Sequence, residues 1–445
     1  KAQLQFGNTN VTAVFSQQNS ESKTVVAEAG ASIEEFELRT TDYDNDRHFF
    51  LSQFFIDNYA NSLKQYPLIS SQVNITRIEV WITNRNATVE DFRSIVAFAD
   101  IGETSSSNLV NSGINPTNPA SVNGVNIPTN ESNNISSVLT ATSGIRDIAT
   151  VDNTLLTTFN MQQGTDYSLL QNARKLQPNE YTLNPQLGYI SLNRRLNDGE
   201  ILAVAYEYTV VGASNGETSF KVGEFSNDGI QAPDNLAVKL LRSEILTTKR
   251  TVNGVEEPFP TWNLMMKNVY ALGAFPLTPD GFRFEIQYRD DQTGIASNTL
   301  QNAQTTGISN TPLLQVMNLD RLDQTQFQNA DGYFDYVEGI TVDSQNGYVI
   351  FPTPEPFGNG LESSLNVQAD VDLFVFDELY LDTKINVKNN NQNKDKFFLK
   401  GYFKSQNAGG IPLGAFNVPQ GSVTVTAGGR QLVEGIDFVV DYIAG

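Results

Sequence analysis

The sequence of 445 residues contains no cysteine and only one histidine, His48. Without a thiol and with a single imidazole, the chain cannot form a cysteine–histidine pair or a histidine-rich zinc site. A small disulfide-stapled module is disfavoured for the same reason. Neither G-x-S-x-G, Walker A nor G-x-G-x-x-G follows a predicted strand. We therefore expect no enzyme, and we assign no catalytic, cofactor-binding or metal-binding residue.

Positive charge is scarce, because 29 lysine and arginine residues face 50 aspartate and glutamate residues, for a formal net charge of −21. Such a surface repels nucleic acids and anionic lipid headgroups, so neither is an expected partner. No stretch approaches the roughly 18 consecutive apolar residues of a transmembrane helix. The chain begins at Lys1 and ends with "DFVVDYIAG", and we interpret it as an internal fragment of a larger protein.

The segment "TDYDNDRHFFLSQFF" places Asp42, Asp44 and Asp46 at the spacing of the first three ligands of an EF-hand calcium loop. That loop also needs glycine at its sixth position and a bidentate glutamate at its twelfth. Arg47 and Gln53 occupy those positions. The calcium interpretation is therefore disfavoured.

The same segment is better explained as the start of a helix over residues 47–64, because Leu51, Phe55 and Tyr59 recur at helical spacing. These apolar residues are expected in the core. His48 then lies in a first turn beside acidic residues, and we interpret it as a structural imidazole. Replacing it with glutamine should cost much less stability than Phe55→Ala.

Alternating apolar and polar residues predict several strands. A hairpin is expected where Asn215-Gly216 supplies a type I′ turn. The strands lie at residues 78–82, in "SIVAFADIGE" (94–103, buried on both faces), at 202–210, 282–289 and after residue 396. Helices are expected at 166–176 and 260–274.

Three places share an apolar residue, an Asn or Asp, three spacers and a glycine: "LNPQLG" (183–188), "VDSQNG" (342–347) and "VDYIAG" (440–445). An Asx side chain can cap a turn that glycine closes, so each predicts a β-arch or hairpin. A metal-binding role for Asp343 and Asp441 is the weaker interpretation. No further oxygen ligand recurs at a fixed offset beside them.

Together these patterns predict an α+β, β-rich fold with mixed antiparallel sheets, hairpins and a few short helices. Residues 105–145 are dominated by Ser, Asn, Thr, Gly and Pro and predict a low-complexity loop that tolerates deletion. The expected organisation is 1–30, barrel or edge strands; 31–104, an α+β unit; 105–145, the loop; 146–300, a helix and hairpin region; 301–358, a β-rich region with an Asx-Gly arch; 359–445, strands and a truncated β module.

Five stretches in order carry a family resemblance. They are "DRHFFL" (46–51), "NITRIEVWITNR" (74–85), "RSIVAFADIGE" (93–103), "YVEGITVDSQNGYVIFPTPEPFG" (336–358) and "GSVTVTAGGRQLVEGIDFVVDY" (421–442). With them the chain resembles the SprA/Sov family, giant outer-membrane proteins of the Bacteroidetes type IX secretion system that are also tied to gliding motility.

The resemblance implies a structural part of a protein-conducting translocon whose parent forms a very large outer-membrane β-barrel. It implies as partners a protein that covers the lateral opening, a periplasmic plug and secreted cargo proteins. Some strands of this chain could belong to that barrel, whereas most of it is expected in soluble regions at the pore mouth or lumen. A cell-surface adhesin or carbohydrate-binding β module is the alternative left open.

Overall fold

The computed structural model describes residues 2–6, 9–13, 26–28, 31–85, 92–117, 119–141, 143–212, 219–273, 275–291, 293–406 and 421–440. The chain divides into two compact units. Lys1–Glu34 and Phe403–Gly445 form the first, and Glu35–Tyr402 form the second. Both cavities described below are lined by residues of the second unit.

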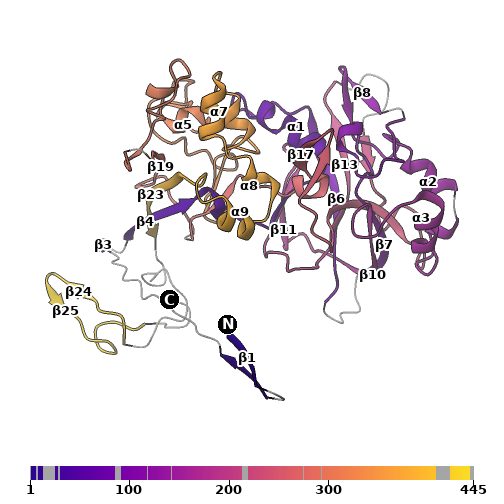
Figure 1. The fold of residues 1–445 in the computed structure, drawn as a ribbon, viewed down its shortest axis with the longest axis horizontal. Coiled ribbons are helices and arrows are strands. Elements are labelled where there is room, and N and C mark those ends of the chain that lie inside the picture. The colour runs from indigo at the N-terminus through magenta and orange to yellow at the C-terminus, as the bar shows by residue number, and fades with distance from the viewer. Residues whose placement is uncertain are drawn as a thin grey trace. The chain divides into compact units, whose positions relative to one another are not determined.

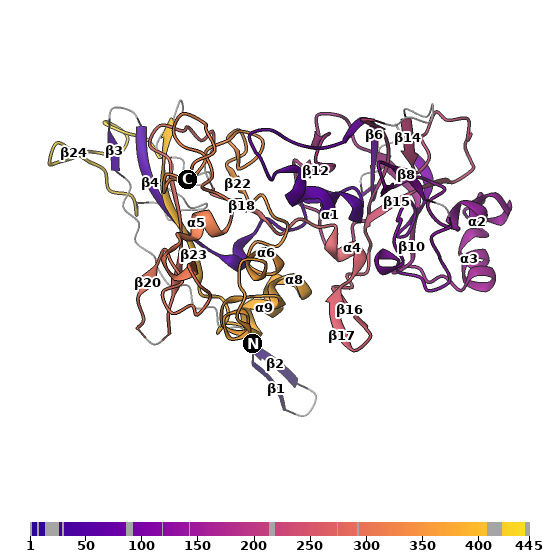
Figure 2. The same cartoon turned by 90° about the horizontal axis from the view of Figure 1, so that it is seen from above.

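Five strands of the second unit close into a small barrel in the order β6-β13-β15-β7-β10 and back to β6. Neighbouring strands are antiparallel except for β7 and β15, which run parallel. In both views the barrel lies at one end of this unit, with α2 (Ile135–Ala141) and α3 (Val151–Phe159) outside it (Figures 1 and 2). The strands are β6 (Val73–Ile82), β7 (Phe92–Phe98), β10 (Tyr167–Lys175), β13 (Leu202–Val210), β15 (Leu236–Arg242) and, beside β13, β14 (Ser219–Val222).

The barrel core combines small residues with a few large ones, as its narrow diameter demands. Ala97, Ala203 and Ala205 share one buried cluster with Trp81 and Phe225. The opposite side of β13 is buried as well, since its side chains are covered by other elements of the unit. This two-sided burial explains why the barrel strands are rich in apolar residues at consecutive positions.

Helix α1 (Gln53–Ser62) packs on the outside of the barrel. The ring of Phe55 lies 6.0 Å from that of Tyr206 on β13, in an edge-on arrangement. Gly188 approaches Phe55 so closely that a Cβ atom there would lie 2.0 Å from the ring. Glycine also suits its φ of +63°. This position therefore fixes the helix against the turn that precedes β12.

Two small three-stranded sheets connect the barrel to the rest of the unit, with orders β11-β12-β5 and β18-β22-β21. Asn184 pairs with Tyr189 and Asp343 with Tyr348 across their turns, so the first two copies of the Asx-Gly pattern are confirmed as hairpins. The third copy falls largely on residues 441–445, outside the described residues. The strands are β5 (His48–Phe50), β11 (Tyr181–Asn184), β12 (Tyr189–Leu192), β18 (Val269–Ala271), β21 (Val342–Asp343) and β22 (Tyr348–Ile350).

A five-stranded sheet has the order β20-β19-β23-β4-β3. The alternation predicted from residue 282 to 289 is confirmed, because Phe284, Ile286 and Tyr288 are buried while Arg283 and Arg289 are exposed. The strands are β3 (Val26–Glu28), β4 (Ala31–Arg39), β19 (Arg283–Arg289), β20 (Ala296–Ser297) and β23 (Phe397–Gln406).

Short helices and hairpins complete the described structure, which is β-rich as predicted. The helices are α4 (Pro260–Asn263), α5 (Leu313–Val316), α6 (Asn359–Glu362), α7 (Gln368–Phe374), α8 (Glu378–Leu381), α9 (Lys384–Asn390) and the single turns η1 (Thr40–Asp42), η2 (Ser106–Asn108), η3 (Ser143–Ile145) and η4 (Ile308–Asn310). The hairpins are β1 (Ala2–Phe6) with β2 (Thr9–Ala13), β8 (Ala120–Val122) with β9 (Val125–Ile127), β16 (Lys249–Val252) with β17 (Val255–Pro258), and β24 (Thr426–Ala427) with β25 (Arg430–Gln431).

Three helix predictions need correction. Residues 166–176 form strand β10 because barrel pairing with β7 overrides their local helical pattern. The segment 260–274 contains only the short α4 before it enters strand β18. The helix expected over 47–64 begins later, at Gln53, because residues 48–50 pair with β12.

Residues 105–145, predicted to form a low-complexity loop, contribute side chains to the core in the described part of this segment. Ile114, Ile127 and Ile135 are at most 5% exposed. Polar side chains also hold the backbone: buried Asn133 donates from Nδ2 to the carbonyl oxygens of Asp100 and Glu103, at 2.7 and 2.9 Å. The few apolar residues of segment 105–145 are concentrated at buried positions. Composition alone does not reveal this distribution.

The domain boundary expected at residue 104 falls inside the barrel. Strands β6 and β7 precede it, and β10, β13 and β15 follow it. These strands belong to one compact unit.

Candidate functional site

A densely connected polar cluster of the second unit surrounds Asp44, which is completely buried. Its backbone N–H donates to the carbonyl oxygen of Val269 at 2.7 Å, which fixes the residue against β18. Arg195 donates to Oδ1 from Nε at 2.7 Å and also from Nη2. Arg47 lies 3.2 Å from Oδ2. The two guanidinium groups therefore compensate the buried negative charge.

His48 completes this cluster, with only 2% of its surface exposed. Its Nε2 lies 3.2 Å from Oδ2 of Asp44, and its Nδ1 lies 2.7 Å from Oγ of Ser191. The ring of Tyr348 meets the imidazole edge-on at a centroid distance of 5.0 Å. Both ring nitrogens thus have polar neighbours, as a buried imidazole requires.

Burial dominates the protonation of this pair. It lowers the pKa of His48, against the opposing effect of the Asp44 carboxylate, so the imidazole favours its neutral form. Burial also acts to raise the pKa of Asp44, but the hydrogen bond from His48 and the charges of His48, Arg47 and Arg195 together lower it to about 2. A neutral imidazole bonded to an ionised carboxylate is the resulting state at neutral pH.

Asp44, His48 and Ser191 have the composition of a hydrolytic triad, so their geometry must be weighed against that chemistry. Ser191 and His48 are directly opposite each other in the β12–β5 ladder. Their contact is therefore an ordinary cross-strand pair. Two arginines share the carboxylate, and neither of the two cavities described below is lined by Ser191. The arrangement stabilises the junction of β5 and β12, and we assign it no catalytic step.

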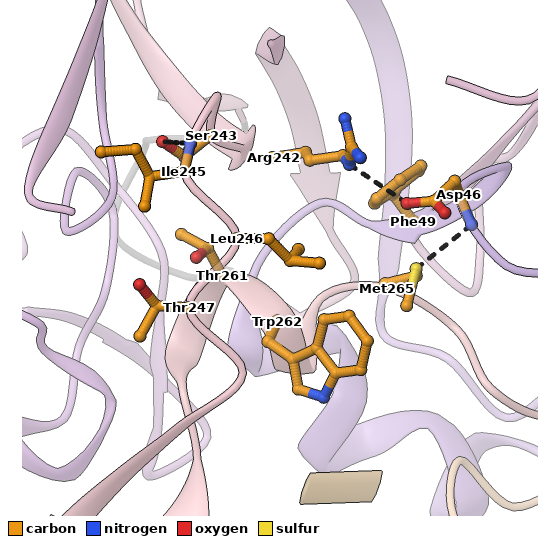
Figure 3. Close-up of a pocket in the computed structure, with 10 residues that line it drawn as sticks. All are labelled: Asp46, Phe49, Arg242, Ser243, Ile245, Leu246, Thr247, Thr261, Trp262 and Met265. Atoms are coloured by element: carbon orange, nitrogen blue, oxygen red, sulfur yellow. Dashed lines mark hydrogen bonds and ion pairs between the residues drawn. The ribbon is translucent and has the colours of Figure 1, made fainter. Parts of the chain in front are cut away.

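A small cavity lies where the segment after η1, the end of β15 and α4 meet (Figure 3). Arg242 Nε lies 3.1 Å from Oδ1 of Asp46, and the Asp46 N–H donates to the sulfur of Met265 at 3.2 Å. Figure 3 shows Trp262 and Leu246 on the other side of this space. Its volume of about 10 Å³ accommodates a single water molecule and no larger ligand.

A larger groove of about 150 Å³ lies beside α1. Phe55, Tyr59, Leu187 and Val210 contribute apolar surface. Amide and hydroxyl groups contribute the polar part of the lining, and Asp, Glu, Lys, Arg and His are absent from its described lining residues. In a chain with a net charge of −21, this local neutrality distinguishes the groove.

The three acids of the calcium-like segment are not brought together. Asp42 pairs with Lys388 at 2.7 Å, Asp44 with Arg195, and Asp46 with Arg242. Each carboxylate therefore has its own cationic partner. Within the part of the chain that the structure describes, no group of three or more His, Cys, Asp or Glu residues could hold a metal ion.

Asp343 is a turn former in the structure. Its Oδ1 accepts the backbone N–H of Asn346 at 3.1 Å, and its Oδ2 accepts from the amide of the same residue at 2.8 Å. Asp441 lies outside the described residues. The turn interpretation is therefore confirmed for Asp343.

A buried ion pair between Lys239 and Glu103 escaped the sequence analysis. The signal was present, because Lys239 interrupts the apolar run "LAVKLLR". A lysine in such a strand requires a buried partner. The sequence does not identify that partner, since Glu103 lies far away along the chain.

These features define a β-rich protein whose buried charges serve as structural cross-links between segments. Residues 1–196 match the family model SprA_N, described as "Motility related/secretion protein". This segment therefore belongs to a family of motility and secretion proteins, not to an enzyme family, and the match supports membership of the chain in the SprA/Sov family. No curated protein matches the chain. None of the helices in the described ranges is both long and apolar enough to cross a membrane.

Proposed function

We propose that this chain is a structural, non-catalytic segment of an outer-membrane protein-conducting translocon of the type IX secretion system, which also serves gliding motility. The observation that carries the proposal is the match of residues 1–196 to a motility and secretion family. The family-like stretches at 336–358 and 421–442 extend the resemblance beyond the matched segment.

The polar cluster around Asp44 supports the non-catalytic part of the proposal. Its carboxylate is shared by Arg47, Arg195 and His48, so its hydrogen-bonding capacity is used within the protein. A catalytic carboxylate would instead need access to a substrate.

In this proposal most of the chain occupies soluble regions at the pore mouth or lumen of the parent barrel. A protein that covers the lateral opening, a periplasmic plug and secreted cargo are its partners. The net charge of −21 suits a pore wall that must not bind its cargo tightly.

The test uses the full-length parent with Val80→Asp. Val80 is fully buried on β6 and opposite Val204 of β13, so an unpaired carboxylate there should disrupt the barrel. We expect loss of the parent from the detergent-extracted outer-membrane complex, and loss of both protein secretion and gliding. Asn74→Asp is the matched control, because Asn74 is exposed on the same strand.

Normal assembly and secretion by the Val80 variant would contradict the proposal. So would hydrolysis of a substrate by the purified chain at enzyme-like rates that Ser191→Ala abolishes. A parent that is released from cells without detergent and binds surface glycans would favour the adhesin instead.

A further inference from the structure

Two buried carboxyl groups share one ammonium group at the end of strand β7. Asp100 and Glu103 are each 2% exposed, and Lys239 on β15 is 1% exposed. Lys239 Nζ lies 2.5 Å from Oε1 of Glu103, whereas Asp100 forms no ion pair with any residue of the described ranges. One ammonium group compensates only one carboxylate, so a negative charge on Asp100 is in excess within this buried cluster.

The carboxyl group of Asp100 holds the start of the following segment in place. Its Oδ1 accepts the backbone N–H of Val110 at 2.7 Å, and its Oδ2 accepts the backbone N–H of Asn111 at 2.9 Å. These two bonds keep residues 105–111 folded back over Asp100 and cover its carboxyl group. Burial of this carboxyl group and closure of the segment are therefore one event.

Residues 105–111 have few other attachments. Leu109 is buried, whereas Ser106 and Ser107 are exposed. Nη1 of Arg250 on β16 donates to the carbonyl oxygen of Leu109 at 2.5 Å, and Nδ2 of Asn111 donates to Asp166 at 2.9 Å. A segment that buries little apolar surface and is held mainly by polar contacts can open while the barrel stays folded.

The state of Asp100 depends on the charges around it. The charged side chains on the elements packed against this site are Glu103, Lys239, Arg250, Asp166 and, on α1, Asp57. Burial raises the pKa of Asp100 to about 6, although the two N–H groups and the Lys239 ammonium act to lower it; the Glu103 carboxylate raises it further.

Opening of the segment changes this pKa. Once residues 105–111 move away, water reaches the carboxyl group and its pKa returns toward the ordinary value of about 3.8. The closed segment therefore binds the proton more tightly than the open one. By linkage, a rise in pH from about 4 to about 6 shifts the equilibrium toward opening, and a further rise has little effect.

We propose that Asp100 makes residues 105–111 a pH-dependent flap, which is held closed by a proton on the carboxyl group and opens more readily when that proton is lost. The flap is independent of the translocon assignment, because it rests on this cluster alone. Acid strengthens the closed state, in contrast to its effect on the Asp44 cluster.

The test measures hydrogen–deuterium exchange of the full chain by mass spectrometry at pH 5 and pH 7, with labelling times scaled for the intrinsic pH dependence of exchange. We expect the opening equilibrium constant of peptides that cover residues 105–111 to rise about tenfold from pH 5 to pH 7, the change that the two pKa values produce by linkage. Peptides from β13 should exchange far more slowly at both pH values, because the barrel stays folded during opening.

Variants assign the proton to Asp100. Asp100→Asn and Asp100→Ser cannot titrate, so each should abolish the pH dependence, and the second covers the case in which the amide fits poorly between the two N–H donors. Asp57→Asn and Asp166→Asn are the matched controls, because each removes another carboxyl group near the segment. Both controls should keep the tenfold change.

Three results would overturn the proposal. The first is an opening constant in the wild type that does not change between pH 5 and pH 7. The second is a pH dependence that persists in both Asp100 variants or disappears in either control, which would assign the proton to another group. The third is exchange of residues 105–111 no faster than that of β13, because the segment would then open only when the barrel unfolds.

Discussion

Lys239 on β15 and Glu103 form an ion pair of 2.5 Å with only 1% and 3% of their side chains exposed. The ammonium group also donates to the carbonyl oxygen of Ala99 at 2.5 Å. The carboxylate accepts from the backbone N–H of Gln53 at 3.3 Å, at the start of α1. This pair therefore ties the barrel to its covering helix.

We expect Lys239→Met to destabilise the protein by about 3–5 kcal/mol, because it leaves the Glu103 carboxylate buried without its counter-ion. The double variant Lys239→Met with Glu103→Leu should recover part of that loss, because it also removes the buried, unpaired carboxylate. Urea denaturation of the wild type, both single variants and the double variant checks this. Strictly additive effects would show that the two groups are not coupled.

Phe55→Ala should cost about 3–5 kcal/mol of unfolding free energy, because it removes a buried ring and leaves a cavity beside the barrel. Phe55 is 3% exposed and contacts Tyr206, whereas the neighbouring Phe54 is only partly buried. Phe54→Ala is the matched control and should cost clearly less. Equal losses measured by thermal and urea unfolding would mean that α1 does not pack as described.

His48→Gln should cost about 1–3 kcal/mol, the penalty for a buried polar group that loses its partner. The loss should still be smaller than that of Phe55→Ala, although His48 is buried between Asp44 and Ser191. Ser191→Ala should cost less stability, because it removes only the hydrogen bond between Ser191 Oγ and His48 Nδ1. Differential scanning calorimetry of both variants gives the comparison, and an unchanged unfolding temperature for His48→Gln would contradict the role of the imidazole.

Acidification should destabilise the protein as Asp44 becomes protonated. Its folded pKa of about 2 lies below the unfolded value of about 3.8, so its contribution is complete only above about pH 5 and is lost as the pH falls to 2 and below. The shift corresponds to roughly 2 kcal/mol. Urea denaturation between pH 6 and pH 2 should therefore show a steeper decline for the wild type than for Asp44→Asn. Parallel pH profiles would refute the assignment.

The segment 105–145 supplies a pair of variants on one strand. Ile127 of β9 is 2% exposed, whereas Val125 of the same strand is 42% exposed. Ile127→Ala should cost about 2–5 kcal/mol, and Val125→Ala should stay within about 0.5 kcal/mol. Deletion of the whole segment should destabilise the second unit, contrary to the expectation from composition. Unchanged stability after deletion would restore the loop interpretation.

The sequence predicted strands well where one face of the strand is buried and the other is exposed to solvent. Strand β19 is the clearest case. Its apolar and polar residues alternate because successive side chains of a strand point to opposite faces of the sheet. The Asx-Gly pattern predicted the β11–β12 and β21–β22 turns for a similarly local reason, since Asn184 and Asp343 bond the backbone of their own turns. In both cases the determining contacts lie within a few residues.

Predictions failed where distant pairing decides the structure. Strand β10 carries a helix-like pattern, yet it pairs with β7 along most of its length. The partners of Asp44, Lys239 and His48 could not be inferred either, because Arg195, Glu103 and Ser191 come from remote segments. No property of an isolated segment encodes such contacts.

The closure of the barrel by β13 and β15 has a consequence for biosynthesis. The strands β6, β7 and β10 all lie within residues 1–196, but β13 begins at Leu202 and β15 ends at Arg242. A chain that emerges from the ribosome, or crosses a membrane, N-terminus first exposes these three apolar strands with unpaired edges. The edges stay unpaired until the chain has emerged as far as Arg242. We therefore expect the family-matched segment, expressed alone, to expose the unpaired edges of β6 and β7 and to aggregate.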